Sequence, residues 1–174
     1  TPYGCIDGVL LMELICDAEG DVAPRLGDVT MSAEQAIEDH GLVMIYVVRM
    51  LCAGVVHGDL SEFNVLVDEK GPVIIDLPQA VNAAANNQAE SMLNRDVNNM
   101  TNYYGQFAPE LLDTRYAKEI WELYEAGDLH SDIVLTGEFH EDEQSADVDA
   151  VLTEISAAIK EEEARLERMK PDEL

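Results

Sequence analysis

Oxygen-bearing side chains stand in the stretch His57-Gly-Asp-Leu-Ser-Glu-Phe-Asn64, and another follows twelve residues later at Asp76. A loop that leads into a hairpin would place Asp59 and Asn64 at the strand entry and return Asp76 to the same edge. Phosphoryl transfer needs a carboxylate that orients or deprotonates the attacking hydroxyl, and an amide and a second carboxylate that hold Mg²⁺ against the phosphates. The spacing therefore predicts a catalytic role for Asp59 and metal-binding roles for Asn64 and Asp76.

The order of these residues, an aspartate, an asparagine five residues on and an aspartate after a hairpin, is that of the protein-kinase catalytic loop. Each residue also has an ordinary structural use, since Asp and Asn cap turns and bond to nearby backbone. The coincidence of all three favours the functional interpretation. A histidine such as His57, just before such a loop, is more often a buried hydrogen-bonding brace than a proton carrier, so we assign it a structural role.

Strands are expected to position Asp59, Asn64 and Asp76. The β-branched runs Val65–Val67 and Val73–Ile75 flank the turn-rich residues 68–72, which predicts a hairpin with a five-residue connection. Upstream, the apolar run Val9–Ile15 precedes the turn-rich residues 17–21. That pattern predicts a buried strand that ends in a loop.

A largely buried helix is expected over residues 32–53. Ser32 and Gln35 form a capping box in front of a dense apolar stretch, and Gly41 weakens the helix without ending it. The longest apolar run, Leu42–Val48, has seven residues. A bilayer-spanning helix needs roughly 20, so we expect no membrane segment here.

Two further helices are expected after the hairpin, over residues 88–104 and 109–126. Gly127 is predicted to end the second of them. Their apolar faces recur at helical spacing: Leu93, Val97, Met100 and Tyr104 in the first, and Leu112, Tyr116, Ile120, Leu123 and Tyr124 in the second, with Trp121 in a core role.

The last part of the chain changes character. Residues 138–149 hold six acids and no bases, which predicts a solvated linker. Val151–Met169 repeats apolar residues at helical spacing and is expected to form a tail helix that docks on a partner.

The charge of the chain limits its partners. It has 174 residues, 10 Lys and Arg against 36 Asp and Glu, and a net charge of −26, so we expect no direct binding to nucleic acid or to an anionic membrane. Solubility or salt adaptation is the more ordinary explanation of that charge, and a basic protein partner is the alternative. Cys5, Cys16 and Cys52 form no zinc or disulfide pattern, and the sequence opens without a signal peptide, so a cytoplasmic location is expected.

With these motifs in place, the sequence resembles the RIO family of atypical serine/threonine protein kinases. The likeness rests on HGDLSEFN at 57–64, IIDLPQAV at 74–81 and NRDVNNMTNYY at 94–104, and it covers about residues 9–125. Small-molecule kinases of the aminoglycoside and choline type share only the sparser Asp, Asn and Asp frame. Ala108-Pro-Glu110 imitates the end of a kinase activation segment, but Pro and Glu also suit the first turn of a helix, and RIO-like proteins have no such segment.

The resemblance implies an α+β, mainly helical fold, the C-terminal lobe of a protein kinase with a short catalytic-loop hairpin. It implies ATP and Mg²⁺ as cofactors, Asp59 as the catalytic aspartate, and Asn64 and Asp76 as magnesium ligands. Asp76 itself could also accept the phosphoryl group in an ATPase cycle. The stretch Met12-Glu13-Leu14-Ile15 would be the hinge that meets adenine through Met12, Glu13 and Ile15; an ordinary core strand explains it equally well.

The sequence departs from a complete kinase, because no Gly-rich loop and no lysine precede the proposed hinge. We therefore expect most of the N-terminal lobe to be absent and the isolated chain to be inactive. The expected division is a hinge strand region at 1–16, a kinase-like C-terminal lobe at 17–135, an acidic linker at 136–149 and a tail helix at 150–174. A catalytically silent protein-interaction lobe and a small-molecule kinase are the alternative functions, and no protein substrate is implied.

Overall fold

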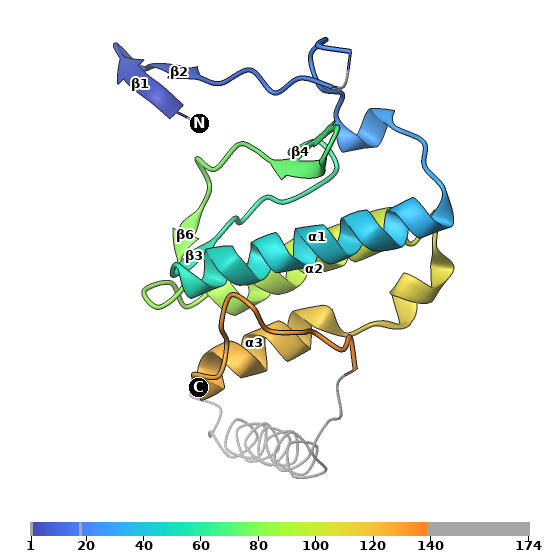
Figure 1. Ribbon diagram of the computed structural model, residues 1–174. Helices are drawn as coiled ribbons and strands as arrows, with labels where there is room; N and C mark the ends of the chain where they lie inside the picture. The colour runs from blue at the N-terminus through green and yellow to red at the C-terminus, as the bar shows by residue number, and fades with distance from the viewer. Residues whose placement is uncertain (1, 18, 139–174) are drawn as a thin grey trace, which may run out of the picture. The chain divides into compact units, whose positions relative to one another are not determined.

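The first long helix begins at the residue that its capping box predicts. In the computed structural model, which describes residues 2–17 and 19–138, α1 runs over Ala33–Cys52 (Figure 1). The Ser32 hydroxyl accepts a hydrogen bond from the Gln35 amide at 3.2 Å, so one of the free N–H groups at the helix start has a partner. Gly41 lies inside the helix on its exposed side. The predicted helix over 32–53 is confirmed.

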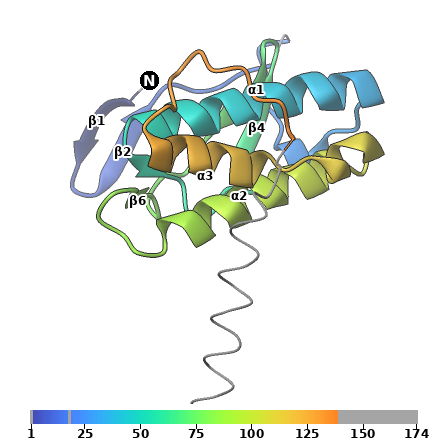
Figure 2. The ribbon, with the colours of Figure 1, turned by 90° about the horizontal axis from the view of Figure 1, so that it is seen from below.

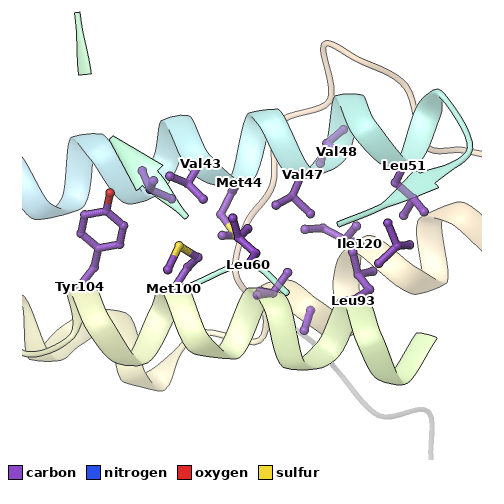
Figure 3. Close-up of a cluster of buried hydrophobic side chains, with 14 of the residues drawn as sticks. Val43, Met44, Val47, Val48, Leu51, Leu60, Leu93, Met100, Tyr104 and Ile120 are labelled. Atoms are coloured by element: carbon purple, nitrogen blue, oxygen red, sulfur yellow. The ribbon is translucent and has the colours of Figure 1, made fainter. Parts of the chain in front are cut away.

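The second helix, α2, runs over Ala89–Tyr104 and buries the apolar face expected of it. It packs against α1 and against the third helix, α3 (Tyr116–Ala126), as the view from below shows (Figure 2). The core lies between these helices (Figure 3). Its labelled side chains come from α1 (Val43, Met44, Val47, Val48 and Leu51), from α2 (Leu93, Met100 and Tyr104), from α3 (Ile120) and from the loop residue Leu60.

The expected single helix over 109–126 is wrong, because the chain forms two elements there. The 3₁₀ helix η2 covers Pro109–Asp113, and α3 starts only at Tyr116. Between them Thr114 is extended, with φ −80° and ψ 157°, and its hydroxyl donates to the Leu111 carbonyl at 2.6 Å. This local side-chain bond competes with continuation of the helix. The predicted end at Gly127 is confirmed by its left-handed φ of 78°.

One apolar residue of that segment is also placed differently from the expectation. Leu112 was expected to pack in the core but is 47% exposed. It lies over Gly105, where an added Cβ would collide with the Leu112 Cδ2 atom. The absence of a side chain at Gly105 therefore allows η2 to cross the end of α2.

The hairpin that carries the predicted site is present, but its turn is shorter than expected. Strands β4 (Val65–Asp68) and β5 (Gly71–Ile74) pair antiparallel, and Asp68 is opposite Gly71. The connection is therefore two residues rather than five, because both ends of the turn-rich segment join the ladder. Asp68 accepts a hydrogen bond from the Lys70 amide at 2.7 Å, which closes the turn.

Two more strand pairs complete an α+β fold with three α-helices among the described residues. Strands β3 (Val55–Val56) and β6 (Val81–Asn82) bracket the loop and hairpin, so the segment between them leaves and returns at one place (Figure 1). Strands β1 (Pro2–Ile6) and β2 (Val9–Met12) form a separate hairpin.

The β1–β2 hairpin corrects the expected buried strand over Val9–Ile15. A strand does form, but it ends at Met12, and every residue of both strands is exposed. The two-residue turn Asp7-Gly8 has φ values of 50° and 79°, the geometry for which an Asp-Gly pair is suited. The apolar run therefore reflects strand propensity, while burial would require a packed layer that the described elements do not supply.

The expected linker and tail fall mostly outside the described residues. Of the linker, Thr136 and Gly137 donate backbone hydrogen bonds to the Glu119 carboxylate at 2.8 Å each. The tail helix expected over 150–174 lies wholly outside them. Within the described part of the chain, no helix combines the length and apolar character needed to cross a bilayer.

Candidate active site

The catalytic-loop stretch, residues 57–64, joins β3 to β4 and is anchored in the core at its centre. Leu60 is fully buried among the helices (Figure 3), and burying a leucine side chain stabilises by about 1.5–3 kcal/mol. Gly58 has φ +82°, and a Cβ there would lie 2.8 Å from the Gln79 carbonyl oxygen. A glycine is therefore required where the loop meets the segment after Asp76.

A buried carboxylate on α2 holds the backbone of this loop. Asp96 is 1% exposed and accepts hydrogen bonds from the Gly58 amide at 2.7 Å and from the Leu60 amide at 3.0 Å. The neighbouring Arg95 donates to the Gly58 carbonyl, and Asn99 donates to the Leu60 carbonyl at 3.0 Å. Burial raises the pKa of Asp96, while the two amide bonds oppose that shift by favouring the carboxylate.

Sequence reasoning missed the role of Asp96, although a signal for it existed. The residue lies between Leu93 and Val97 on the buried, mostly apolar face of α2. A charged residue on a buried face is rarely left without partners. The position therefore indicated that some backbone or cation must approach α2 there.

The predicted catalytic residue and one predicted metal ligand are in direct contact. The Asn64 amide donates to the Asp59 carbonyl at 2.8 Å and approaches the Asp59 Oδ2 atom at 3.5 Å. Gln79, which sequence reasoning did not assign, donates to the same Oδ2 atom at 3.0 Å. Two atoms are left without a hydrogen-bond partner within the described part of the chain, Asp59 Oδ1 and Asn64 Oδ1.

His57 connects this loop to the residue before Asp76. Its Nε2 atom is 3.0 Å from the Ile75 carbonyl, which can only accept, and its Nδ1 atom is 3.3 Å from the Asp59 amide, which can only donate. A neutral imidazole protonated on Nε2 satisfies both partners. The ring is 3% exposed, so the expected role as a buried brace is confirmed.

Asp76 directly follows Ile75 and so lies beside the hydrogen-bonded set of Asp59, Asn64 and Ile75, which we call the bonded frame. The Ile75 amide donates to the Asn64 carbonyl at 2.9 Å, so the entry and the exit of the hairpin are tied together next to Asp76. Asp76 has φ +67°, a left-handed conformation that costs a non-glycine residue on the order of 1 kcal/mol or more. Its carboxylate is exposed and has no hydrogen bond or ion pair with any described residue.

The backbone around the expected hinge leads to this frame. Met12 ends β2, pairs with Pro2 and is 46% exposed. The Ile15 carbonyl accepts from the Ala23 amide at 3.0 Å, and the chain then reaches β4, where Val67 donates to the Pro24 carbonyl at 2.9 Å. The segment that follows the hinge therefore contacts the hairpin through its backbone.

The oxygen atoms of Asn64 and Asp76 that have no hydrogen-bond partner among the described residues suit a hard divalent cation. Carboxylate and amide oxygens are the ligands that Mg²⁺ accepts, usually one or two from the protein and the rest from water and phosphate. Asn64 Oδ1 and the Asp76 carboxylate are two such ligands at one edge. No group of three or more His, Cys, Asp or Glu side chains that could hold a metal ion occurs among residues 2–17 and 19–138. A cation here would therefore depend on phosphate oxygens as well.

The sequence around this site also matches a known protein family. The family model of the RIO domain matches residues 1–117, two thirds of the chain. The chain belongs to the RIO family. The RIO domain match includes the catalytic loop, the hairpin, Asp76 and all of α2, and it confirms the family inferred from the three motifs.

Similar proteins carry the same family name. The RIO-type serine/threonine-protein kinase Rio1 of Haloferax volcanii is 41% identical over 103 residues, 59% of this chain and 34% of that protein. Rio1 of Thermoplasma acidophilum is 37% identical over 103 residues, 59% of this chain and 52% of that protein. Rio2 of Methanocaldococcus jannaschii is 51% identical over 55 residues, 31% of this chain and 20% of that protein. The chain thus matches between a fifth and about half of the length of these RIO kinases.

Proposed function

We propose that this chain carries the catalytic-loop lobe of an ATP- and Mg²⁺-dependent phosphotransferase that acts on serine or threonine of a protein. The lobe corresponds to the C-terminal lobe of a protein kinase. The observation that carries the proposal is the set of hydrogen bonds that ties Asn64 to Asp59 and Ile75, the residue before Asp76, to Asn64. Membership of the RIO family supports the same chemistry.

Asp59 is suited to position the attacking hydroxyl. Its Oδ2 atom accepts from Gln79 and lies near the Asn64 amide, so both amides restrict rotation of the carboxylate. The Oδ1 atom is then the acceptor for the hydroxyl of the incoming serine or threonine. It receives the hydroxyl proton as the new O–P bond forms and the bond between the γ-phosphorus and the bridging oxygen breaks, so that ADP leaves. Because Asp96 holds the backbone on both sides of Asp59, the carboxylate keeps its position during this step.

Asn64 and Asp76 would hold the magnesium ion. Mg²⁺, when bound, neutralises negative charge on the phosphates and on the transferring group. The Asn64 amide is oriented by its bond to the Asp59 carbonyl, which leaves Oδ1 for the cation. The left-handed backbone of Asp76 directs the chain away from β5 directly after Ile75, where the hairpin returns to Asn64.

Two further roles complete the proposal. The hinge residues Met12, Glu13 and Ile15 would meet the adenine of ATP, since the chain continues from Ile15 to the hairpin that bears the metal ligands. In addition, the Asp76 carboxylate is itself an exposed nucleophile. If it takes the γ-phosphoryl group, ADP leaves, and water then cleaves the acyl phosphate, which gives an ATPase cycle.

The test is transfer of labelled phosphate from Mg-ATP by the full-length protein, with Asp59→Asn as the variant. We expect turnover to fall on the order of 10²–10⁴-fold while the affinity for ATP stays within about threefold. Asp128→Asn removes a carboxylate that lies outside the site and should leave transfer unchanged. Unchanged transfer by Asp59→Asn would remove this residue from the chemistry, and absence of nucleotide binding by the wild-type protein would favour the silent interaction lobe.

A further inference from the structure

A recess in the surface lies away from the residues of the candidate active site. It has a volume of about 530 Å³ and is lined by residues 29–32, by one side of α1 and by residues 67–71 of the β4–β5 hairpin. We call it the hairpin cleft. The β5 strand of the hairpin packs against α1, and the chain before α1 comes from the 3₁₀ helix η1 (Leu26–Asp28). Volumes of roughly 300–1,000 Å³ are typical of ligand sites, and neither Asp59, Asn64 nor Asp76 lines this one.

The wall of the cleft contains a carboxylate in which one oxygen has a hydrogen-bond partner. Asp39 on α1 is 2% exposed, and its Oδ1 atom accepts from the Gln35 side chain at 2.9 Å. Its Oδ2 atom has no partner within residues 2–17 and 19–138. Buried carboxylates are normally paired with a cation or fully hydrogen-bonded. Burial raises the pKa of Asp39; the hydrogen bond from Gln35 opposes this shift, and the nearby charge of Glu38 adds to it.

The hairpin approaches this carboxylate without a side chain. Gly71 has φ +118°, and a Cβ at that position would lie 3.5 Å from Asp39 Oδ1 and 3.1 Å from Leu42 Cδ1. The positive φ favours glycine, and the contacts leave little room for a larger residue. Asp39 therefore lies next to the backbone of the hairpin at Gly71, on the wall of the cleft.

The chemistry of the walls selects the kind of ligand. Four carboxylates line the cleft, Glu38, Asp39, Asp68 and Glu69, against the single ammonium of Lys70. Apolar side chains stand between them: Val29, Met31, Leu42 and Val67. Lys and Arg side chains combine an apolar stem with a cationic head, so they match such a surface. A metal ion matches it less well, because the acids of the described residues form no group that could hold one.

We propose that the hairpin cleft binds a basic segment of a protein partner, with a lysine or arginine head opposite Asp39 and its stem along the apolar wall. This interaction goes beyond the proposed phosphoryl transfer and uses none of its residues. It gives the strongly acidic chain, with its net charge of −26, one specific place for a cationic partner. Electrostatic attraction of the whole surface then speeds the encounter, and the cleft provides the specificity.

The test uses the full chain and a defined peptide, acetyl-Gly-Leu-Arg-Arg-Leu-Gly-amide, in 0.15 M salt, where general charge attraction is screened beyond about 8 Å. The matched control peptide has citrulline in place of both arginines. In an NMR titration we expect the arginine peptide to shift the amides of Ser32, Gln35 and Gly71 most, and the citrulline peptide to shift them little. Shifts spread evenly over the acidic surface, or equal binding of the two peptides, would overturn the proposal.

Variants locate the interaction. Asp39→Asn keeps an oxygen for the Gln35 bond and should fold, but it removes the buried charge, so the peptide affinity should fall about tenfold or more. Thr30→Arg, at an exposed position of the lining, places a cation in the cleft and should weaken binding to the same extent even if Asp39→Asn melts early. Asp128→Asn changes the net charge by the same amount at an exposed site outside the cleft and should change affinity less than twofold. If Asp128→Asn weakened peptide binding as much as Asp39→Asn or Thr30→Arg does, the proposal of a specific site would be refuted.

Discussion

A buried histidine should make the stability of this fold depend on pH. His40, on α1, is 1% exposed, and its Nε2 atom is 3.0 Å from the Thr101 hydroxyl. Its ring packs against Tyr104 and Tyr116, with centroids 5.7 and 5.4 Å away. Burial lowers the pKa of His40 from 6.5 to about 4, because the charged ring would lose its hydration without gaining a counter-ion.

The sign and size of the effect follow from that difference. The unfolded chain binds the proton near pH 6.5 and the folded chain only near pH 4, so the stabilisation is complete above pH 6.5 and is lost as pH falls toward 4. Between pH 7 and pH 5 this amounts to about 2 kcal/mol, out of roughly 3 kcal/mol in total. Asp39 and Asp96 have raised pKa values and act with the opposite sign, since their protonated forms are favoured in the folded state.

The measurement must therefore be a difference between variants. We would follow urea unfolding at pH 7 and pH 5 for the wild type, for His40→Gln and for His130→Gln, in which an exposed histidine is replaced. Because the carboxyl contributions are common to all three, the wild type and His130→Gln should lose about 2 kcal/mol more than His40→Gln between these pH values. An identical pH dependence of His40→Gln and wild type would refute the argument, because His40 would then titrate alike in both states.

Other outcomes are expected at the candidate site and in the core. Asp76→Asn should abolish the magnesium dependence of ATP binding in calorimetric titration, and unchanged dependence would exclude Asp76 as a ligand. Phosphate label trapped on the full-length wild-type protein should be released by hydroxylamine if Asp76 accepts it, whereas resistant label indicates serine or threonine. The 174-residue chain alone should melt cooperatively yet hydrolyse ATP no faster than its Asp59→Asn variant, because all four of its lysines follow the proposed hinge. Tyr104→Phe should match or exceed the wild type by up to about 1 kcal/mol in urea unfolding. The Tyr104 hydroxyl points toward α1 without a partner among the described residues (Figure 3), so a loss above 1 kcal/mol would reveal one.

The elements that were predicted correctly are those with a complete local signal. The cap formed by Ser32 and the spacing of the apolar face of α2 each lie within a few residues of the helix that they define. Such signals act whether or not distant parts of the chain are known, because they satisfy backbone groups or form one continuous face.

The elements that were predicted wrongly depend on competition or on packing. Thr114 could have continued the helix, but its hydroxyl bonds to Leu111 and the chain becomes extended. β2 has the composition of a buried strand, yet its burial depends on which layer covers it, and a run of apolar residues carries no information about that layer. Propensity predicted the element type in both places, while tertiary contacts decided its length and exposure.

In the candidate site, too, some features depend on local sequence and others on contacts between distant parts of the chain. Asp59, Asn64 and Asp76 were proposed as a site because a loop followed by a hairpin can bring them near one edge, and the structure shows bonds from Asn64 to Asp59 and from Ile75 to Asn64. Asp96 is 36 residues from Leu60, and its two bonds to the loop exist only once α2 packs beneath it. The short motif thus specifies which side chains could do chemistry, but the precision with which they are held depends on a charge buried in a distant helix. Because a buried carboxylate with two amide donors is costly to disrupt, the loop and α2 must be formed together for the frame around Asp59 to exist.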